Sequence, residues 1–556
     1  MNRLRRLATA VATTALALAL AACSGLPTSG PVNAGQPIAD DRGDSFPVFA
    51  PNGPAKDATP QQIVEGFIAA GSGPQGTWAT ARQFLAPGFD WNPRAGVTVY
   101  APGDRDLVAT GEHDFTLTVR PVATIDAAGE LSAEAGEIPL SYSLAKQDDG
   151  QWRITDAPQG VVLDRNFFAI VYGAYSLQFF DPSWTYLVPD QRWFPRQYAT
   201  TSIATALVNG GPSEWLQGAV ATAFTDAARL ATQAVPLQSG IASVALQDGA
   251  RQLDQTVLDR MQTQLEASLK PAGVNAVDMM SAEQLLSATP VAVRETRVDS
   301  RPLVRTAEAF GFLSGTSVVT IPGLSEALLQ IDAQDIEVSV DRTTAAVRNS
   351  AGAAMRVTTS GAAVLDARPG LLAPSIDPNG YIWTVPQDAP SAVRAFAAGA
   401  GNGIEIADAW PGAQQILSQR VSRDGTRIAA IVRGGDGYAL WVAGILRNRD
   451  GAPTGFGTPK VLAQLPASAS GLAWVDASTV AALTTQTGDP YLYTQSIGGF
   501  AETVRTPALV TTVAGGAQSG GLRVRDSTGE LYSRGGANWQ HVASGIVVLA
   551  QQQGTP

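Results

Sequence analysis

The sequence predicts a multidomain protein of α+β and all-β class: a small N-terminal α+β domain, an α/β domain and a C-terminal β-propeller. Three observations support this prediction. Amphipathic helical patterns precede alternating strands in residues 59–162, apolar strands alternate with helical patterns in residues 163–300, and helical periodicity fades from residue 301 onward. A chain of 556 residues is also too long to fold around one hydrophobic core, so several domains are expected.

The first 22 residues are typical of a secretory signal. A basic start, MNRLRR, precedes a 16-residue apolar run that is too short and too small-sided for a comfortable membrane span. The run ends in Leu20-Ala21-Ala22-Cys23, which resembles the bacterial lipobox. The resemblance implies cleavage before Cys23 and its conversion to an N-palmitoyl and S-diacylglycerol cysteine. An ordinary signal peptide that happens to contain a cysteine is the alternative.

Cys23 is the only cysteine of the chain, which excludes an intramolecular disulfide and favours a membrane tether. Two or three acyl chains provide the double anchor that stable attachment requires. We therefore expect a protein anchored by lipid to the cell membrane, on the extracytoplasmic side. Removal of residues 1–22 leaves 35 basic against 49 acidic residues, a net charge of −14 that disfavours a nucleic-acid partner.

Residues 23–58 are predicted to be the lipidated cysteine and a flexible tether. The stretch 24–60 contains seven prolines and five glycines, which cannot propagate a helix and leave little to bury. A flexible coil of 37 residues has a root-mean-square reach on the order of 35 Å. That reach is enough to lift the first folded domain off a membrane.

Residues 59–162 are predicted to form the small α+β domain. Thr59 fits a helix N-cap, with Pro60 at the first helical position and Gln62 three residues after the cap. A second short helix is expected over residues 76–88, and strands follow. The DDGQWRI hairpin, Asp148–Ile154, is common at the last turn of cone-shaped nuclear-transport-factor-like domains; an ordinary hairpin with a packed tryptophan is an equal alternative.

Residues 163–300 are predicted to form an α/β domain. Strands are expected at 167–181 and 184–195, helical patterns at 199–224, and strands again at 234–249. A further helix ends at Pro271 and has apolar residues spaced four apart: Val257, Met261, Leu265 and Leu269.

Residues 301–556 contain a weak internal repeat, in which a polar turn precedes an alternating strand. The turns are Asn379-Gly380, Asp424-Gly425, Asp476-Ala477 and Thr528-Gly529, at spacings of 45, 52 and 52 residues. This period, with several strands per repeat, is typical of a β-propeller, and we expect five or six blades. A β-sandwich, with turns about every 8–12 residues, is the alternative. The repeat VSRDGTRIAAIV, residues 421–432, resembles the blade motif of TolB-type periplasmic proteins.

Catalytic motifs are missing from the sequence. GFLSG, residues 311–315, has the wrong spacing for a nucleophile elbow, and GAGNG, residues 399–403, lacks the third glycine of a dinucleotide loop. The two histidines, His113 and His541, are expected at a hairpin surface and in a strand of the last blade. We predict no catalytic residue, no cofactor and no metal site.

Carboxylate pairs are the remaining candidates for catalysis, because a glycosidase needs only two acids at the right separation. Acids at turns, however, ordinarily hydrogen-bond the backbone, and we expect that role here. The candidates are Asp40-Asp41, Asp148-Asp149 and the turn acids Asp377, Asp424 and Asp476.

Three stretches carry a resemblance to a known family: LPTSGPV at 26–32, YSLQFFDPSWTYLVPDQRWFPR at 175–196, and ATALVNGGPSEWLQGAVATAF at 204–224. With the order of signal, tether and three domains, they resemble LpqB, a lipoprotein family of actinobacteria, over essentially the whole mature chain. The last two look like the start of a GerMN module, which implies that residues 163–300 form a GerMN-like domain.

The resemblance implies a non-enzymatic partner of the extracytoplasmic domain of a sensor histidine kinase. The implied system is a two-component system of the MtrA–MtrB type that influences cell-wall homeostasis and division. No catalytic residues belong to the family pattern, and only the lipid-bearing Cys23 transfers to this chain. The alternative is an extracellular glycan-binding or hydrolytic protein that uses the central mouth of its propeller.

Overall fold

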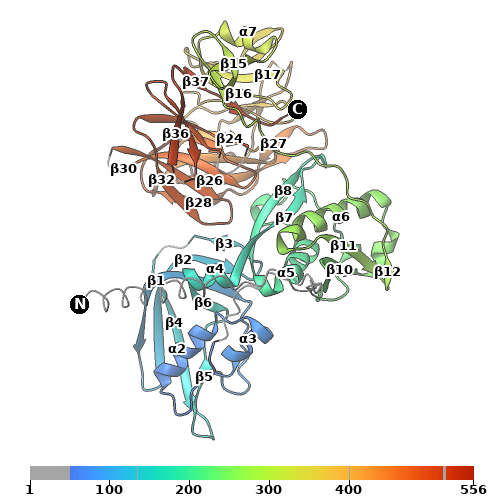
Figure 1. Cartoon of the computed structure of the whole chain (residues 1–556), viewed down its shortest axis with the longest axis vertical. Coiled ribbons are helices and arrows are strands. Elements are labelled where there is room, and N and C mark those ends of the chain that lie inside the picture. Colours follow the sequence, from blue (N-terminus) through green and yellow to red (C-terminus); the bar gives the residue numbers. More distant parts are fainter. Residues whose placement is uncertain are drawn as a thin grey trace, which may run out of the picture. The chain divides into compact units, whose positions relative to one another are not determined.

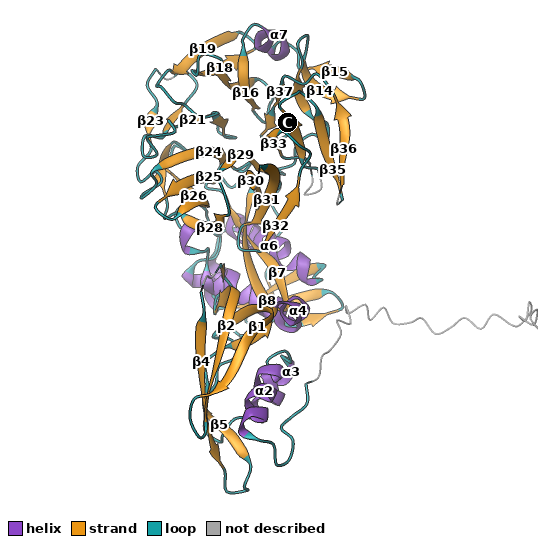
Figure 2. Cartoon of the chain, turned by 90° about the vertical axis from the view of Figure 1, so that its left-hand side faces the viewer, coloured by secondary structure: helices purple, strands orange, loops and turns teal. Residues whose placement is uncertain are grey.

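Three parts of the chain each enclose hydrophobic cores of their own (Figure 1). The computed structural model describes residues 51–133, 136–399, 401–486, 488–517, 521–536 and 538–555, which all belong to one structural unit, Phe49–Pro556. Strands dominate this unit, with a few helices between them (Figure 2). The predicted combination of α+β and all-β domains is confirmed.

The first helix begins at the predicted cap. Helix α2 spans Pro60–Ala70; the Thr59 side chain accepts a hydrogen bond from Gln62 N at 3.3 Å, and Gln62 Oε1 accepts one from Thr59 N at 2.9 Å. This capping box satisfies two backbone donors that would otherwise have no partner. A second helix, α3, follows at Gln75–Arg82.

The first domain packs these helices against a sheet with strand order β5-β4-β2-β1-β6. Its neighbouring strands are antiparallel except β1 and β6, which run parallel, and β3 pairs with β2 at the side. The strands are β1 Gly96–Ala109, β2 Asp114–Asp126, β3 Leu131–Ser132, β4 Ile138–Lys146, β5 Trp152–Asp156 and β6 Val161–Asp164.

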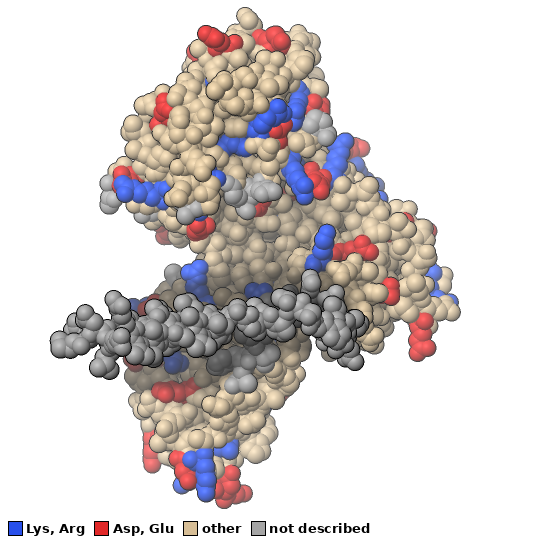
Figure 3. Space-filling model, in the orientation of Figure 1, with Lys and Arg blue, Asp and Glu red and all other residues tan. Residues whose placement is uncertain are grey.

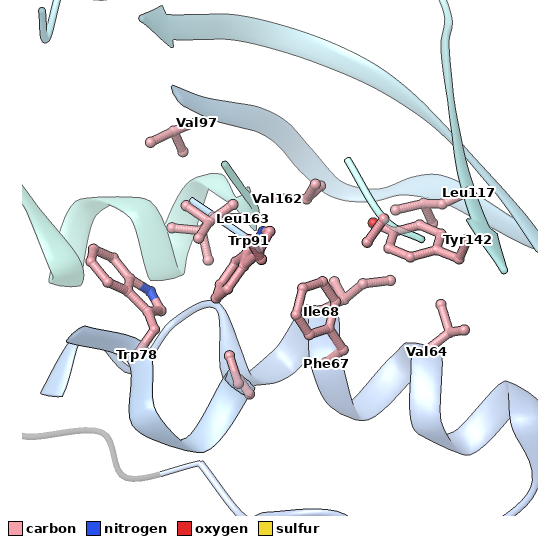
Figure 4. Close-up of a cluster of buried hydrophobic side chains, with 14 of the residues drawn as sticks. Val64, Phe67, Ile68, Trp78, Trp91, Val97, Leu117, Tyr142, Val162 and Leu163 are labelled. Carbon is pink, nitrogen blue, oxygen red and sulfur yellow. The ribbon is translucent and has the colours of Figure 1, made fainter. Parts of the chain in front are cut away.

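Aromatic side chains fill the space between the helices and this sheet (Figure 4). Phe67 contacts Trp91 edge-on with ring centroids 4.9 Å apart and approaches Tyr142 at 6.3 Å. Trp78 and Trp91 are almost completely buried. Rings packed edge-to-face stabilise a core by roughly 0.5–1.5 kcal/mol per pair beyond their burial. Only about 10 Å³ of free space remains beside them, so this part of the domain is a packed core.

The strand expected at 167–181 is wrong over its first five residues. Helix α4 occupies Arg165–Val171, because Asp164 caps it by accepting from Asn166 N and Phe167 N at 2.8 and 3.2 Å. Phe168 and Val171, three residues apart, then lie on one helical face and pack into the core of the first domain. The first core therefore extends to Tyr172, ten residues beyond the predicted boundary at 162.

A long hairpin leads from the first domain into the second. Strands β7, Tyr172–Phe180, and β8, Leu187–Pro195, pair along their whole length. Asp181 shapes the connecting turn, because its carboxylate accepts from the backbone amides of Ser183, Thr185 and Tyr186.

The second domain contains a sheet of order β12-β11-β10-β9, in which β10 and β11 are parallel. Helix α6, Gln255–Leu269, makes the crossover between them, as a parallel pair requires. The expected apolar spacing of α6 is confirmed, because Met261, Leu265 and Leu269 are fully buried. The strands are β9 Leu237–Gln238, β10 Ile241–Leu246, β11 Ala276–Ser281 and β12 Gln284–Leu285.

The helical pattern expected at 199–224 is correct only in its first half. Helix α5, Ala199–Thr205, continues as a π-helical turn, Ala206–Gly210, and a 3-10 turn, Glu214–Leu216, follows. Residues 217–224 are not helical. Gly211 and Gly218, with φ of 80° and 78°, adopt the left-handed backbone that interrupts a helix. Further 3-10 turns are Arg196–Tyr198, Asp226–Ala228, Asp248–Gln252 and Lys270–Ala272.

The C-terminal part is a β-propeller, as predicted, and its described residues form six sheets, within the predicted range of five or six blades. The first blade contains β13 Leu303–Arg305, β14 Phe310–Ser314 and β15 Ser317–Thr320. The second blade contains β16 Ala333–Val338, β17 Thr344–Asn349, β18 Ala354–Thr358 and β19 Gly361–Asp366. The third blade contains β20 Ser375–Ile376, β21 Ile382–Thr384, β22 Arg394–Phe396 and β23 Ile404–Glu405. Helix α7, Leu324–Leu329, joins the first two.

The last three blades follow in chain order. The fourth blade contains β24 Gln415–Val421, β25 Arg427–Gly434, β26 Gly437–Arg447 and β28 Lys460–Leu465, with β27 Pro453–Phe456 beside β26. The fifth blade contains β29 Ala469–Trp474, β30 Thr479–Gln486, β31 Asp489–Ser496 and β32 Ala501–Arg505. The sixth blade contains β33 Val510–Ala514, β34 Arg523–Asp526, β35 Leu531–Gly535 and β36 Asn538–Ala543.

The end of the chain closes the propeller. Strand β37, Val548–Leu549, pairs antiparallel with β13 and supplies the inner strand of the first blade. Strand β38, Gln551–Gln552, then runs parallel to β16. Strands β37, β16, β20, β24, β29 and β33 follow one another around the axis. The first blade therefore combines residues from both ends of the propeller, which removes an open sheet edge.

The repeat identified in the sequence is offset in one blade. Asn379-Gly380, Asp424-Gly425 and Asp476-Ala477 lie between the first and second strands of their blades, whereas Thr528-Gly529 lies between the second and third strands. A true equivalent was missed at Ser339 and Asp341, in the second blade. There the serine hydroxyl donates to the aspartate at 2.5 Å, as Ser422 does to Asp424 at 2.7 Å.

One loop of the propeller contacts both other domains. Gly498 O accepts hydrogen bonds from Gln191 Nε2 and Trp193 Nε1 of β8, at 3.0 and 2.8 Å. The neighbouring Phe500 ring lies 5.5 Å from the Trp193 ring and 6.0 Å from that of Phe168 in α4. The propeller loop, β8 and α4 therefore meet at one aromatic cluster, which lies at the edge of the first core.

The closing strand should dominate the stability of the propeller. Leu549, 4% exposed, packs with the first and last blades, so Leu549→Ala should destabilise the propeller by about 2–4 kcal/mol. Denaturant unfolding followed by tryptophan fluorescence measures this change. Val547→Ala, at a position 46% exposed, is the matched control and should change stability by about 0.5 kcal/mol or less. Equal effects of the two substitutions would contradict the closure argument.

Candidate functional site

The predicted lipid site and one acidic pair lie outside the described residues. Cys23 and Asp40-Asp41 both belong to this part of the chain. The lipidation of Cys23 therefore stays a prediction from the sequence.

His113 lies beside the start of β2, at a surface hairpin. Its ring packs against Trp152 at a centroid distance of 4.5 Å, and its Nε2 lies 3.8 Å from Glu112 Oε1. The side chain is half-exposed. This arrangement stabilises the hairpin and offers no catalytic geometry.

His541 lies on β36 and belongs to a Ser-His-Glu cluster that the sequence did not reveal. Its Nε2 lies 2.5 Å from Glu530 Oε2 and 3.4 Å from Ser544 Oγ, while Ser544 Oγ donates to Glu530 at 2.7 Å. A catalytic triad needs the acid and the hydroxyl on opposite ring nitrogens, so that the imidazole can pass a proton between them. Here both contact the same nitrogen, so the cluster lacks the geometry of a triad.

The turn acids of the propeller hold the ends of strands together. Asp377 accepts from Tyr381 N at 2.9 Å, from Trp383 Nε1 at 3.0 Å and from Arg447 Nη2 at 2.6 Å. Asp476 accepts from Ser478 N at 2.7 Å. In the first domain, Asp149 of the exposed Asp148-Asp149 pair accepts from Gln151 N at 2.9 Å. These acids have the structural role that turn acids ordinarily have.

Asp424 forms a completely buried ion pair with Arg427, three residues later. Burial raises the pKa of the Asp424 carboxyl, but Arg427 and the hydrogen bonds from Thr426 outweigh it and leave the pKa below its usual value. The Arg427 guanidinium also lies 5.1 Å from the centroid of the Trp474 ring in the next blade. The pair therefore joins two blades; Asp424 borders a pocket of about 400 Å³, but its carboxylate is buried and bound by Arg427 and Thr426.

Polar side chains from several inner strands meet around a buried glutamate. Glu337 on β16 accepts from Ser375 Oγ at 2.9 Å and from Gln553 Nε2, and its other carboxylate oxygen lies 3.7 Å from Arg420 Nε. Burial raises the pKa of the Glu337 carboxyl, although Arg420 and the hydrogen bonds oppose this shift. Glu337 Oε2 has no hydrogen-bond partner within the described part of the chain. The network ties the second, third and fourth blades to the C-terminal segment.

The segment that enters the propeller is bound by two buried arginines. Arg423 Nη1 donates to Thr296 O at 3.5 Å, and Arg523 Nη2 donates to Ser300 O. Burial lowers the pKa of both guanidiniums to about 10, so both stay charged at neutral pH. Arg423 also binds the carbonyl of Trp474 at 2.9 Å, so the entering segment is fastened to the fourth, fifth and sixth blades.

Asp299 in the same segment is held by two arginines. Its carboxylate binds Arg301 at 2.7 Å and Arg342 of the second blade at 3.3 Å, and its backbone amide donates to Gln552 Oε1 of β38 at 3.1 Å. The hydrogen bonds from Arg301 lower the pKa of Asp299 to about 2, against the effect of its burial. Asp299 therefore joins the entry segment, the second blade and the C-terminus.

A pocket with a volume of about 680 Å³ lies where the first domain meets the second. The β2–β3 turn forms one wall, and β8, α5 and the π-helical turn Ala206–Gly210 form the other. Arg192 of β8 lines it, is 3% exposed and pairs with Asp190 at 2.8 Å. Its Nη1 donates to Ala128 O at 3.0 Å. No sequence pattern indicated this pocket, because its walls come from two domains.

Across the described ranges, no three His, Cys, Asp or Glu side chains gather as a possible metal site. Within the same ranges, every helix is too short or too polar to cross a membrane.

Two family descriptions match the chain. "Lipoprotein LpqB, N-terminal domain" matches residues 53–169, and "Lipoprotein LpqB beta-propeller domain" matches residues 303–549. The second match agrees with the six sheets observed in that region.

Curated relatives carry the same name. Lipoprotein LpqB of Bifidobacterium longum is 26% identical over 497 residues, which are 80% of each chain. Those of Rhodococcus opacus and Rhodococcus jostii are 30% and 31% identical, and the chain spans 43% and 36% of their respective lengths. Among solved structures, TolB from Acinetobacter baumannii is similar at 12% identity and a TM-score of 0.33, covering 53% of this chain and 82% of that one. That structural likeness is too weak to support an argument.

The Asp299 contacts should make the propeller sensitive to acid. A carboxyl with a depressed pKa stabilises the fold above about pH 4, and this contribution is lost as the pH falls toward about 2. Asp299→Asn should therefore lower the free energy of unfolding by on the order of 1 kcal/mol at pH 7. This difference from the wild type should shrink below about pH 4. Denaturant midpoints of both proteins at a series of pH values measure this stability difference. Asp436→Asn, in the exposed turn between β25 and β26, is the control; a pH-independent deficit in Asp299→Asn would contradict the argument.

Proposed function

The chain belongs to the LpqB family of lipoproteins, and from this premise we propose that it works by contact, as a non-enzymatic partner of a sensor histidine kinase. The partner surface is the extracytoplasmic domain of a kinase of the MtrA–MtrB type. Through that kinase the protein affects cell-wall homeostasis and division.

The filling of the propeller is the observation that favours contact over turnover. Glu337, Arg420 and Gln553 form a buried network among the inner strands, and Arg423 and Arg523 fasten the entry segment. A hydrolase of the glycosidase type needs two carboxylates around an accessible bond. The acids considered for that role in the propeller bind arginine or backbone amides instead. Because the interior of the propeller is filled, we infer that the protein acts through contacts made by its outer surface.

Anchoring at Cys23 is the second part of the proposal. Attachment of both partners to one membrane confines their encounter to a thin layer, where effective concentrations reach the millimolar range for short flexible links. A modest interface is then sufficient. The lipoprotein shifts the signalling equilibrium of the kinase if it binds the two signalling states with different affinities.

Charge should contribute to this contact. The mature chain carries a net charge of −14, yet acidic and basic side chains are interspersed on the face seen in Figure 3. We therefore expect several small complementary charge pairs at the interface. Their attraction is screened by salt, so the affinity for the purified kinase domain should fall as ionic strength rises.

A test in cells separates anchoring from mere presence. Kinase output is compared among the wild type, a Cys23→Ala variant, residues 24–556 exported in soluble form, residues 24–556 fused to an unrelated transmembrane helix, and a deletion. We expect full output from the wild type and the fusion, and reduced output from the soluble form. Cys23→Ala should accumulate as an unprocessed precursor without bound lipid.

Two outcomes would contradict the proposal, provided that protein levels are matched by immunoblot. Full output from the soluble form would show that tethering is irrelevant. Output that is indifferent to the deletion would show that the kinase is not the partner.

A further inference from the structure

The pocket between the first and second domains has the size and lining of a small-ligand site. Its volume of about 680 Å³ falls within the roughly 300–1,000 Å³ typical of such sites. One wall includes the π-helical turn Ala206–Gly210, a rare conformation that occurs frequently at functional sites. The walls are fixed to each other, because Gly129 O of the β2–β3 turn accepts from Trp193 N at 2.8 Å.

The charges deep in the pocket compensate one another. Arg192 pairs with Asp190 at 2.8 Å and lies 3.5 Å from Glu130 Oε1, while Glu130 Oε2 lies 3.6 Å from Lys460 Nζ of the propeller. Asp190 also accepts from Ser213 Oγ and N, both at 2.8 Å. Of the other charged residues in the lining, Asp126 accepts from the backbone amides of Ala128 and Glu130, Arg94 lies over the Tyr198 ring, and Glu214 adds one more acid. Charges of both signs are therefore nearly balanced around the pocket, and the lining favours an uncharged ligand over an anion or a cation.

Neutral hydrogen-bonding groups also line the pocket. They come from α5, the π-helical turn and the loops that follow: Ser202, Thr205, Asn209, Gln217 and Gln233. Hydroxyl and amide side chains both donate and accept, and so do the hydroxyl groups of a sugar. The aromatic residues Tyr172 and Trp193 add apolar area to the lining, which suits the apolar faces of sugar rings.

A buried donor supports the same conclusion. Arg192 Nε has no hydrogen-bond acceptor within the described ranges, although the side chain is only 4% exposed. An unpaired buried donor in a native protein calls for an explanation such as a bound water or ligand. The oxygen of a hydroxyl group is an acceptor of the kind that would satisfy it.

From this arrangement we propose that the pocket binds an uncharged saccharide of about one or two rings. The site lies outside the propeller axis, and the proposal goes beyond the kinase contact proposed above. Gly210 lies on its wall, and a Cβ atom added at this glycine would meet open space. A larger side chain there would therefore fill the pocket without backbone strain.

The test uses the full-length protein in micelles of lauryldimethylamine oxide, a detergent without a sugar headgroup. Saturation-transfer NMR and isothermal titration are run with a panel of neutral saccharides: glucose, N-acetylglucosamine, maltose, cellobiose and N,N′-diacetylchitobiose. Glucuronate and glucosamine serve as anionic and cationic comparisons. We expect at least one neutral saccharide to bind and both charged sugars to bind more weakly.

Variants locate the binding site. Gly210→Phe should abolish binding, and Thr205→Val, which removes one hydroxyl at nearly constant shape, should weaken it about 3- to 10-fold. Gly435→Phe, at a propeller turn where an added Cβ also meets open space, should leave affinity unchanged. Circular dichroism checks the fold of each variant. If Gly210→Phe does not fold, the affinity of Thr205→Val alone tests whether the saccharide binds in the pocket.

Three outcomes would overturn the proposal. The first is the absence of binding by every neutral saccharide of the panel. The second is tighter binding of glucuronate or glucosamine than of any neutral sugar. The third is binding that is unchanged in both Gly210→Phe and Thr205→Val.

Discussion

The pairing of β37 with β13 is the constraint on which the C-terminal half of the molecule depends. A propeller is a ring, and its first blade lacks an inner strand until the last residues of the chain supply one. The same closure fixes the entry segment, because Gln552 accepts from the backbone of Asp299 and donates to the carbonyl of Arg301. The second domain is therefore attached to the propeller where its two ends meet. Gly498 and Phe500, on the fifth blade, extend that attachment to the first domain.

Sequence patterns correctly predicted the elements whose formation depends mainly on residues close together in the chain. Thr59, Pro60 and Gln62 make a complete cap within four residues, and the spacing of Met261, Leu265 and Leu269 describes one face of a helix whatever it packs against. The errors arose where two local signals compete. Residues 167–171 are a continuous apolar run, which is typical of a buried strand, but the Asp164 cap and the core beneath them select a helix. The candidate pocket had no local signal, because Glu130 and Thr205 are brought together only by domain packing.

The faintness of the repeat has a physical cause in the interior of the propeller. Ser339 and Ser422 make the same turn in two blades, but the buried charges beside these turns are different. Asp424 pairs with Arg427 inside its own blade, whereas Glu337 receives groups from other blades and from the C-terminus. A buried charge needs its own partners, so each blade has its own set of polar residues. Six similar backbones are thus built from dissimilar sequences, and only the turn residues repeat visibly.

The position of β37 also governs the order in which the domains can be completed. Domains fold as the chain emerges, N-terminal parts first, so the first two domains can form while the propeller is still arriving. The propeller cannot close until residues 548 and 549, which follow strands β13 to β36 in the chain, have been added. Until then β13 and β16 present unpaired edges to whatever surrounds them. A product that ends before residue 548 would stay open, and proteases could distinguish it from the closed propeller by that open edge alone.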